Sequence, residues 1–253
     1  IDIFEYSFGR GVTLGEKGAK EIGEEFAKNG VEISVHAPYY INFANPDSDM
    51  IKKSIGYVVS SITRLKQLGC GERVVVHPAT QGKALRERAV KVAKENLLLL
   101  IDTIEYNKLN DVKICIETMG KLGQIGTLEE VVDFVNMAPF FYPCIDFGHL
   151  NARTLGGIKT KNDYVKIIEY MEDNLPKEKV VNMHVHFSKI MYGQKGEIRH
   201  LTFDDGANFG PDYEPLMEVF NDKNLLPRII CESSGTQAED TLTMKKYYLS
   251  LKK

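Results

Sequence analysis

The sequence is short of several residue types and patterns that would otherwise suggest a function. It has no tryptophan, and its four cysteines (Cys70, Cys115, Cys144 and Cys231) form no CxxC pair, so we interpret them as small buried residues in a reducing compartment. No signal peptide or long apolar run is present, which predicts a soluble, cytoplasmic protein without a membrane partner. The formal net charge of −3 means that any contact with nucleic acid must come from a local patch.

Apolar strands instead alternate with segments of helical periodicity. Continuous apolar strands of this kind predict an α/β fold with parallel pairing and right-handed crossovers. With 253 residues, 43% of them hydrophobic, we expect a single domain over residues 1–253, a (β/α)8 TIM barrel. The candidate strands are residues 1–8, 32–37, 73–78, 112–117, 142–147, 179–187 and 227–233.

That count is seven strands, whereas a closed barrel of this class has eight. The chain opens in a strand, so we expect that its first βα unit, roughly 25 to 30 residues, is absent from this chain. We also expect a gap or a poorly covered edge at that place in the barrel.

Histidines and carboxylates follow most of the strand candidates. They are His36, His77, Glu117, Asp146, His149, His184, His186, His200 and Glu232. The carboxyl ends of barrel strands meet at one rim, where carboxylates from different strands would be prohibitively desolvated without a cation. A lone histidine at a strand end is more often a hydrogen-bonded core residue, but several on one rim predict a multinuclear metal site. Imidazole and carboxylate together suit Zn²⁺ first and Mn²⁺ second.

Such a centre favours phosphodiester hydrolysis. A carboxylate such as Glu117 could bridge two cations, and a pair of cations generates a nucleophile at neutral pH while neutralising the attacked phosphate.

Six sequence blocks, in register over essentially the whole chain, resemble the endonuclease IV family. They are HAPYYINFANPD (36–47), VVHPA (75–79), IETMGK (116–121), CIDFGHLNAR (144–153), MHVHFSK (183–189) and ICESSG (230–235). The resemblance implies a zinc-dependent TIM-barrel endonuclease that cleaves double-stranded DNA 5′ to abasic sites in base-excision repair. We expect it to act as a monomer.

The resemblance also implies a set of ligands for two to three zinc ions. His36, His77 and Glu117 would hold one zinc. A second would be held by Glu117, which bridges and is catalytic, together with Asp146, His184 and Glu232. His149 and His200 would hold a third, which stabilises the leaving 3′ oxygen.

The third site departs from the family pattern, because Ile198 stands where the family has an aspartate. His186 and Glu197 are equally good substitutes. Tyr39 falls where the family has an aromatic residue that contacts DNA, although a tyrosine packed on the barrel rim is the alternative. Arg10, between Gly9 and Gly11, could contact a DNA phosphate, and a plain loop is the alternative there.

A rival interpretation is a sugar isomerase or epimerase of the xylose isomerase-like superfamily. The set Glu117, Asp146, His184 and Glu232 also resembles the site of those enzymes, which hold one Mn²⁺ or Mg²⁺. His36, His77 and His200 discriminate, since a single hard ion has no use for three further imidazoles. A metal-binding scaffold without catalysis is a third class. Metal analysis separates them: two to three zinc ions support the nuclease, and one Mn²⁺ or Mg²⁺ supports the sugar enzyme.

Overall fold

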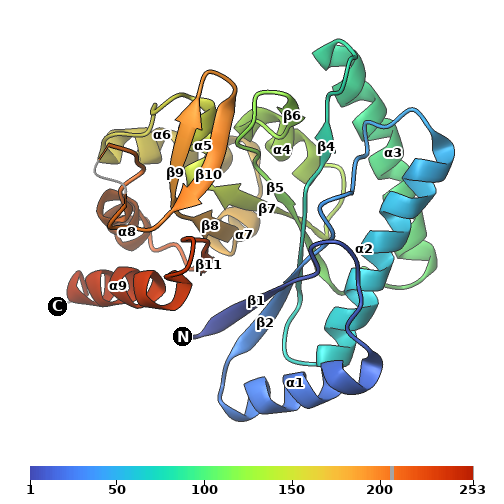
Figure 1. Cartoon of the computed structure of the whole chain (residues 1–253), viewed down its shortest axis with the longest axis horizontal. Helices are drawn as coiled ribbons and strands as arrows, with labels where there is room; N and C mark the ends of the chain where they lie inside the picture. Colours follow the sequence, from blue (N-terminus) through green and yellow to red (C-terminus); the bar gives the residue numbers. More distant parts are fainter. Residues whose placement is uncertain (206–207, 253) are drawn as a thin grey trace.

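Seven parallel strands form a nearly closed barrel in the computed structural model, which describes residues 1–205 and 208–252 (Figure 1). Every hydrogen-bonded pair in this sheet is parallel, as predicted for an α/β barrel. The first and last strands of the sheet lie beside each other. In sheet order the strands are β1 (Ile3–Ser7), β2 (Glu32–His36), β3 (Arg73–Val76), β5 (Lys113–Glu117), β7 (Phe141–Asp146), β8 (His184–Phe187) and β11 (Arg228–Cys231).

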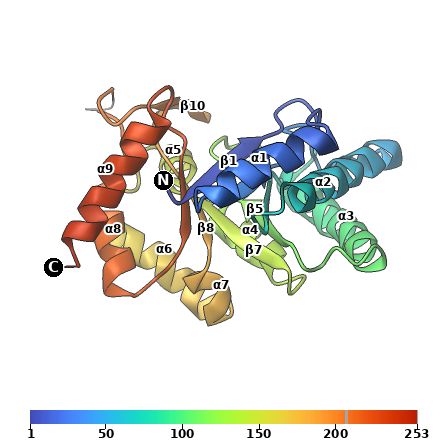
Figure 2. The ribbon, with the colours of Figure 1, turned by 90° about the horizontal axis from the view of Figure 1, so that it is seen from below.

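Helices surround the barrel on its outer face (Figures 1 and 2). Two of their termini show standard capping: α2 ends at Gly69 in the left-handed region, and α4 begins with a capping box of Thr127 and Glu130. The helices are α1 (Glu16–Lys28), α2 (Ser48–Leu68), α3 (Arg86–Tyr106), α4 (Leu128–Val135), α5 (Phe147–Arg153), α6 (Lys161–Asn174), α7 (Lys177–Val181), α8 (Tyr213–Asp222) and α9 (Gln237–Ser250).

Two short antiparallel strand pairs lie outside the barrel sheet. One joins β4 (Ala79–Thr80) to β6 (Gln124–Ile125), and the other is the hairpin of β9 (Lys189–Gly193) and β10 (Gly196–Leu201). The hairpin packs against α5. Gly196 makes the hairpin possible: its φ is +87°, and a Cβ there would lie 2.2 Å from the carbonyl oxygen of Gly120.

One local prediction was wrong. The strand expected at 179–187 begins at His184, and the residues before it form α7. Pro176 precedes this helix, and the Lys179 ammonium donates to the carbonyl oxygens of Val135 and Ala138, which ties the helix to the end of α4. His149 lies on α5, which begins directly after β7.

The seam between β1 and β11 is the place where a gap was expected. Two polar contacts join its sides: the Lys245 ammonium donates to Asp2, and Arg228 Nε lies 3.1 Å from a Glu32 oxygen. Beside them lies a mainly apolar cavity of about 580 Å³ between β1, β11, α8 and α9. Polar contacts therefore join the two sides of the seam, but the space beside it is incompletely packed.

No helix within the described residues combines the length and the apolar character needed to cross a membrane.

Candidate metal centre

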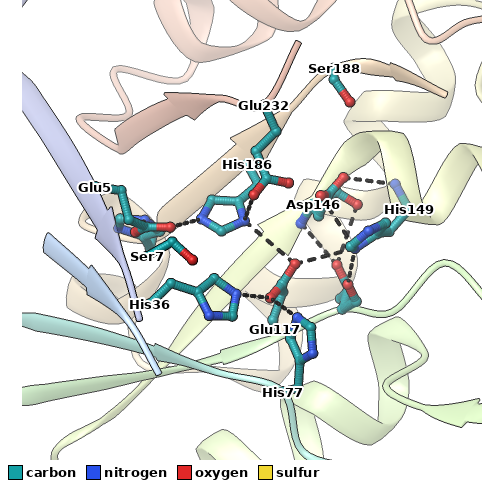
Figure 3. A network of polar contacts seen from close by, with 12 residues as sticks. Glu5, Ser7, His36, His77, Glu117, Asp146, His149, His186, Ser188 and Glu232 are labelled. Carbon is teal, nitrogen blue, oxygen red and sulfur yellow. Dashed lines mark hydrogen bonds and ion pairs between the residues drawn. The ribbon is translucent and has the colours of Figure 1, made fainter. Parts of the chain in front are cut away.

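Polar side chains gather at the carboxyl end of the barrel (Figure 3). Successive side chains of a strand point to opposite faces, so every second residue faces the interior. The last inward positions hold His36 on β2, Glu117 on β5, Asp146 on β7 and His186 on β8, while His77 follows β3 and Glu232 follows β11. This convergence follows from parallel strands that end at one rim.

Glu117 lies at the middle of the cluster, and its two oxygens face different partners. Oε2 is 3.1 Å from His36 Nε2 and 3.0 Å from His77 Nε2. Oε1 is 3.2 Å from His149 Nδ1 and 3.4 Å from His186 Nδ1. Burial opposes ionisation of this carboxyl, but the surrounding imidazoles, His77 foremost, outweigh it and hold the pKa of Glu117 well below its usual value.

Within the part of the chain that the structure describes, four groups of side chains are compact enough to hold a cation, with ligand atoms in each group that all lie within 4.8 Å of one another. Three are at the rim, and Glu117 belongs to two of these. The rim groups are His36–His77–Glu117, Glu117–Asp146–His186–Glu232 and His149–Glu197–His200; the fourth group, Cys144–His184–His186, lies deeper in the barrel. Mixed imidazole and carboxylate donors suit Zn²⁺ or Mn²⁺.

Three of the imidazoles are anchored through one nitrogen. His36 Nδ1 lies 2.8 Å from the carbonyl oxygen of Ala37, and His149 Nδ1 lies 2.9 Å from that of Thr118. His200 Nδ1 is 2.8 Å from Ser188 Oγ. A ring nitrogen that donates to a backbone carbonyl oxygen leaves the opposite nitrogen, here Nε2 of His36 and His149, as an electron-pair donor. These anchors are those expected of histidines that hold a metal ion.

Two buried polar atoms at the rim show that the residues fit a cation. Among the described residues, neither Asp146 Oδ2 nor His186 Nδ1 has a hydrogen-bond partner, although both side chains are fully buried. Burial, reinforced by the negative charges of Glu232 and Glu117 and opposed by His149, raises the pKa of Asp146 to about 6. Asp146 Oδ2 does lie 3.2 Å from His149 Nδ1, but the three buried or half-buried carboxylates of this group remain costly together unless a cation neutralises them.

His186, rather than His184, lies with Glu117, Asp146 and Glu232, where the family resemblance implied His184. The cause is register: β7 and β8 align Asp146 with His186 and Cys144 with His184, so His184 lies one inward layer deeper. Both histidines face the interior, and strand alternation alone does not tell which one reaches the rim.

The structure brings Glu197, rather than His186, to the third group. Glu197 Oε2 is 3.5 Å from His149 Nε2, and the register of the β9–β10 hairpin shifts between Glu197 and Arg199. A bulge of this kind re-aims side chains, so that Glu197 and His200 serve one group while Ile198 is exposed.

Glu5, in the middle of β1, was missed by sequence reasoning. Its Oε2 accepts a hydrogen bond of 2.8 Å from Ser34 Oγ and lies 3.0 Å from His184 Nε2, while Oε1 lies 2.9 Å from His186 Nε2. Burial opposes its charge, but His186 and His184 hold the pKa of Glu5 well below the usual value. The available signal was a glutamate inside the apolar run IDIFEYSF, since unpaired glutamates are rarely buried.

The two residues predicted to contact DNA lie at the surface. Tyr39 is 52% exposed, its ring stacks on His77 with centroids 5.4 Å apart, and its hydroxyl is 3.0 Å from Ser7 Oγ. It therefore stands directly beside the rim groups. Arg10 is exposed in the loop between β1 and α1. Other exposed cations on loops and hairpins that follow the strands are Lys83, Lys121, Lys195 and Arg199.

Comparisons with known proteins agree with this architecture. A family model described as xylose isomerase-like TIM barrel matches residues 1–247. The chain is 33% identical over 247 residues to the uncharacterized protein MJ0133 of Methanocaldococcus jannaschii, covering 98% of this chain and 87% of that protein. It is 30% identical over 202 residues to the probable endonuclease 4 of Acholeplasma laidlawii, covering 76% of this chain but only 64% of that relative.

Among solved structures, a D-tagatose 3-epimerase-like protein superimposes with a TM-score of 0.73. The superposition covers 99% of this chain and 89% of that chain at 22% sequence identity. At this identity the likeness shows the fold alone.

Proposed function

Because the chain belongs to the xylose isomerase-like TIM barrel family, we propose that it is a zinc-dependent, endonuclease IV-like phosphodiesterase. Its proposed substrate is double-stranded DNA, cleaved 5′ to abasic sites in base-excision repair. The observation that carries the proposal is the division of the Glu117 oxygens, one toward His36 and His77 and the other toward His149 and His186. A carboxylate so placed can bridge two cations, and a third donor group lies beside it.

The residues take distinct parts in this reaction. When bound, zinc ions supply an activated water nucleophile and stabilise the charge on the attacked phosphate. Glu117 is the proposed catalytic residue, because it joins the two groups that would carry those ions. Asp146, His186 and Glu232 complete the second group, and His149, Glu197 and His200 form the group that would hold a third ion, whose proposed part is to stabilise the leaving oxygen. Mn²⁺ is the second choice of metal.

The proposed DNA contacts lie around the same rim. The half-exposed ring of Tyr39 stands over His77, where it could stack on a base or sugar exposed at the lesion. The exposed cations Arg10, Lys121 and Arg199 could pair with backbone phosphates, which supplies the local patch that a chain of net charge −3 requires. We expect the protein to act in the cytoplasm as a monomer, and light scattering of the purified protein tests the oligomeric state.

A sugar isomerase or epimerase is the second candidate. It is favoured by the completeness of Glu117, Asp146, His186 and Glu232, which could hold one Mn²⁺ or Mg²⁺ without further help. The two other rim groups would then have no purpose, although their ring nitrogens are anchored as metal ligands are. The nuclease uses all three groups, so we prefer it.

Metal analysis of protein purified without chelator separates the two candidates. Two to three zinc ions for each chain support the nuclease, and one Mn²⁺ or Mg²⁺ supports the sugar enzyme. A protein that binds metal but acts on neither abasic DNA nor sugars would be a scaffold, and both proposals would fail.

Substitution Glu117→Gln tests the mechanism. The amide is neutral and offers one coordinating oxygen, so cleavage of a duplex with a single abasic site should fall by several orders of magnitude, with little change in the folded structure. Glu178→Gln is the control: that carboxylate accepts from the Tyr142 hydroxyl at the opposite end of the barrel, and cleavage should persist. Undiminished cleavage by Glu117→Gln at wild-type zinc content would remove Glu117 from the mechanism.

A further inference from the structure

His186 faces a different kind of partner from the other anchored imidazoles. His36 and His149 contact backbone carbonyl oxygens, and His200 contacts a serine hydroxyl. Behind His186 lies the carboxylate of Glu5, 2.9 Å from Nε2, while Nδ1 on the opposite edge of the ring is 3.4 Å from Glu117 and 3.6 Å from Glu232. Figure 3 shows Glu5 on the far side of the His186 ring from Glu117.

Glu5 is itself held in place from two directions. The parallel register of β1 and β2 sets it beside Ser34, whose hydroxyl donates to Oε2 at 2.8 Å, and His184 Nε2 lies 3.0 Å from the same oxygen. This occupies Oε2 and leaves Oε1 facing His186. The Oε1–Nε2 contact is close without meeting hydrogen-bond geometry, so its attraction is mainly electrostatic.

We propose that Glu5 is a positioning residue of the metal centre, which holds His186 from behind and directs its Nδ1 toward a cation bound by Glu117, Asp146 and Glu232. A carboxylate on the outer nitrogen orients a ligand imidazole and raises its basicity, and loss of such a partner typically costs about 10- to 100-fold in metal affinity. The inference rests on the metal centre of the proposed function and is independent of DNA cleavage.

The deeper group of Cys144, His184 and His186 offers a rival arrangement. A cation there would compete with the rim cation for His186, because the same imidazole belongs to both groups. Glu5 would in that case hold the deeper ion instead of orienting a rim ligand. The donor sets favour the rim, where His186 joins the three carboxylates of Glu117, Asp146 and Glu232, whereas the deeper group has three donors and no carboxylate.

The experiment compares zinc retention by wild-type protein and by Glu5→Gln, Ser34→Ala and Cys144→Ser, using a chelator competition on the full chain. Glu5→Gln should lose one zinc at a chelator concentration about 10- to 100-fold lower than the wild type. Ser34→Ala removes the hydrogen bond that Glu5 accepts from Ser34, leaves the contacts of Glu5 with His184 and His186 in place, and should stay close to the wild type. Cys144→Ser should do the same.

Cobalt(II) in place of zinc adds a spectroscopic readout, since a reoriented His186 should alter the d–d absorption in Glu5→Gln and leave it unchanged in Ser34→Ala. Should Glu5→Gln fail to fold, Glu5→Asp keeps the charge but withdraws it from His186, and it should lose affinity in the same direction. Wild-type protein that binds no zinc would refute the proposed metal centre itself. Zinc-binding wild type with unchanged affinity in the Glu5 variant, or an equal loss in Cys144→Ser, would overturn the role of Glu5 alone.

Discussion

Replacing Asp146 with asparagine should stabilise the metal-free protein at neutral pH and deprive it of zinc. Asp146 is fully buried, and its carboxyl lies among the negative charges of Glu117 and Glu232. The asparagine side chain would keep the oxygen that accepts the backbone N–H of His149 at 2.7 Å, so the start of α5 should survive. The substitution therefore removes a costly charge, and its one further change at the site is the loss of the 3.2 Å ion pair between Oδ2 and His149 Nδ1.

The size of this effect follows from the pKa of Asp146, which burial raises from 3.8 to about 6. A raised pKa means that the folded state holds the proton more tightly than the unfolded state. Below about pH 4 the carboxyl is protonated in both states and does not change the free energy of unfolding. As the pH rises from about 4 through about 6, its charged form increasingly destabilises the folded state. A shift of about two pH units corresponds to about 3 kcal/mol, or roughly 6 to 12 °C in Tm for a chain of this size.

Thermal unfolding of chelator-treated protein at pH 4 and pH 7.5 measures this difference. Asp146→Asn should melt above the wild type at pH 7.5 and close to it at pH 4, where both side chains are neutral. Added zinc should reverse the order, because it stabilises only a chain that binds it in the folded state. Asp133→Asn is the control, since Asp133 is exposed and pairs with Lys94. A metal-free Asp146→Asn that melts at or below the wild type at pH 7.5 would refute the reasoning.

Two further predictions concern the hairpin and an exterior carboxylate. Glu197→Ala should lower the zinc content from three ions toward two, as measured by elemental analysis; if His186→Ala removes that ion and Glu197→Ala does not, the third group is wrongly assigned. Burial of Glu130 disfavours its charged form, but hydrogen bonds from Arg86 and from the backbone N–H groups of Gly126 and Thr127 outweigh this cost and lower its pKa. Glu130→Gln should therefore cost about 1.5 to 3 kcal/mol in urea unfolding at pH 7, and the loss should vanish as the pH falls below the usual glutamate pKa; a loss independent of pH would contradict this.

The barrel could be predicted because each of its seven strands is a local apolar run. Val74, Val75 and Val76 show the pattern: all three are buried, two against helices and one inside the barrel, so the run is apolar throughout. The polar residue that follows such a run must then lie at the rim. His77 and Glu232 were placed at the rim by this argument, and the structure has them there.

Depth within the barrel could not be predicted, because it depends on pairing between strands. His184 and His186 have the same inward direction, and only the register of β7 against β8 sets His186 beside Asp146. The bulge in β10 could not be predicted either. Glu197 and His200 are three residues apart, a spacing that normally places side chains on opposite faces of a strand, and the bulge brings both to the same face.

Glu5 shows why a site can include a residue that carries no motif. Backbone hydrogen bonds join β1 to β2, and on its other side β1 lies against β11 across the seam. The Glu5 carboxylate crosses the barrel from this edge strand to His184 and His186 on β8, in addition to its bond to Ser34 on β2. Its two oxygens therefore tie together strands from both sides of the seam through buried charge. The contacts of one carboxylate therefore contribute both to closing the barrel and to orienting the rim imidazoles, so a substitution at Glu5 should affect both.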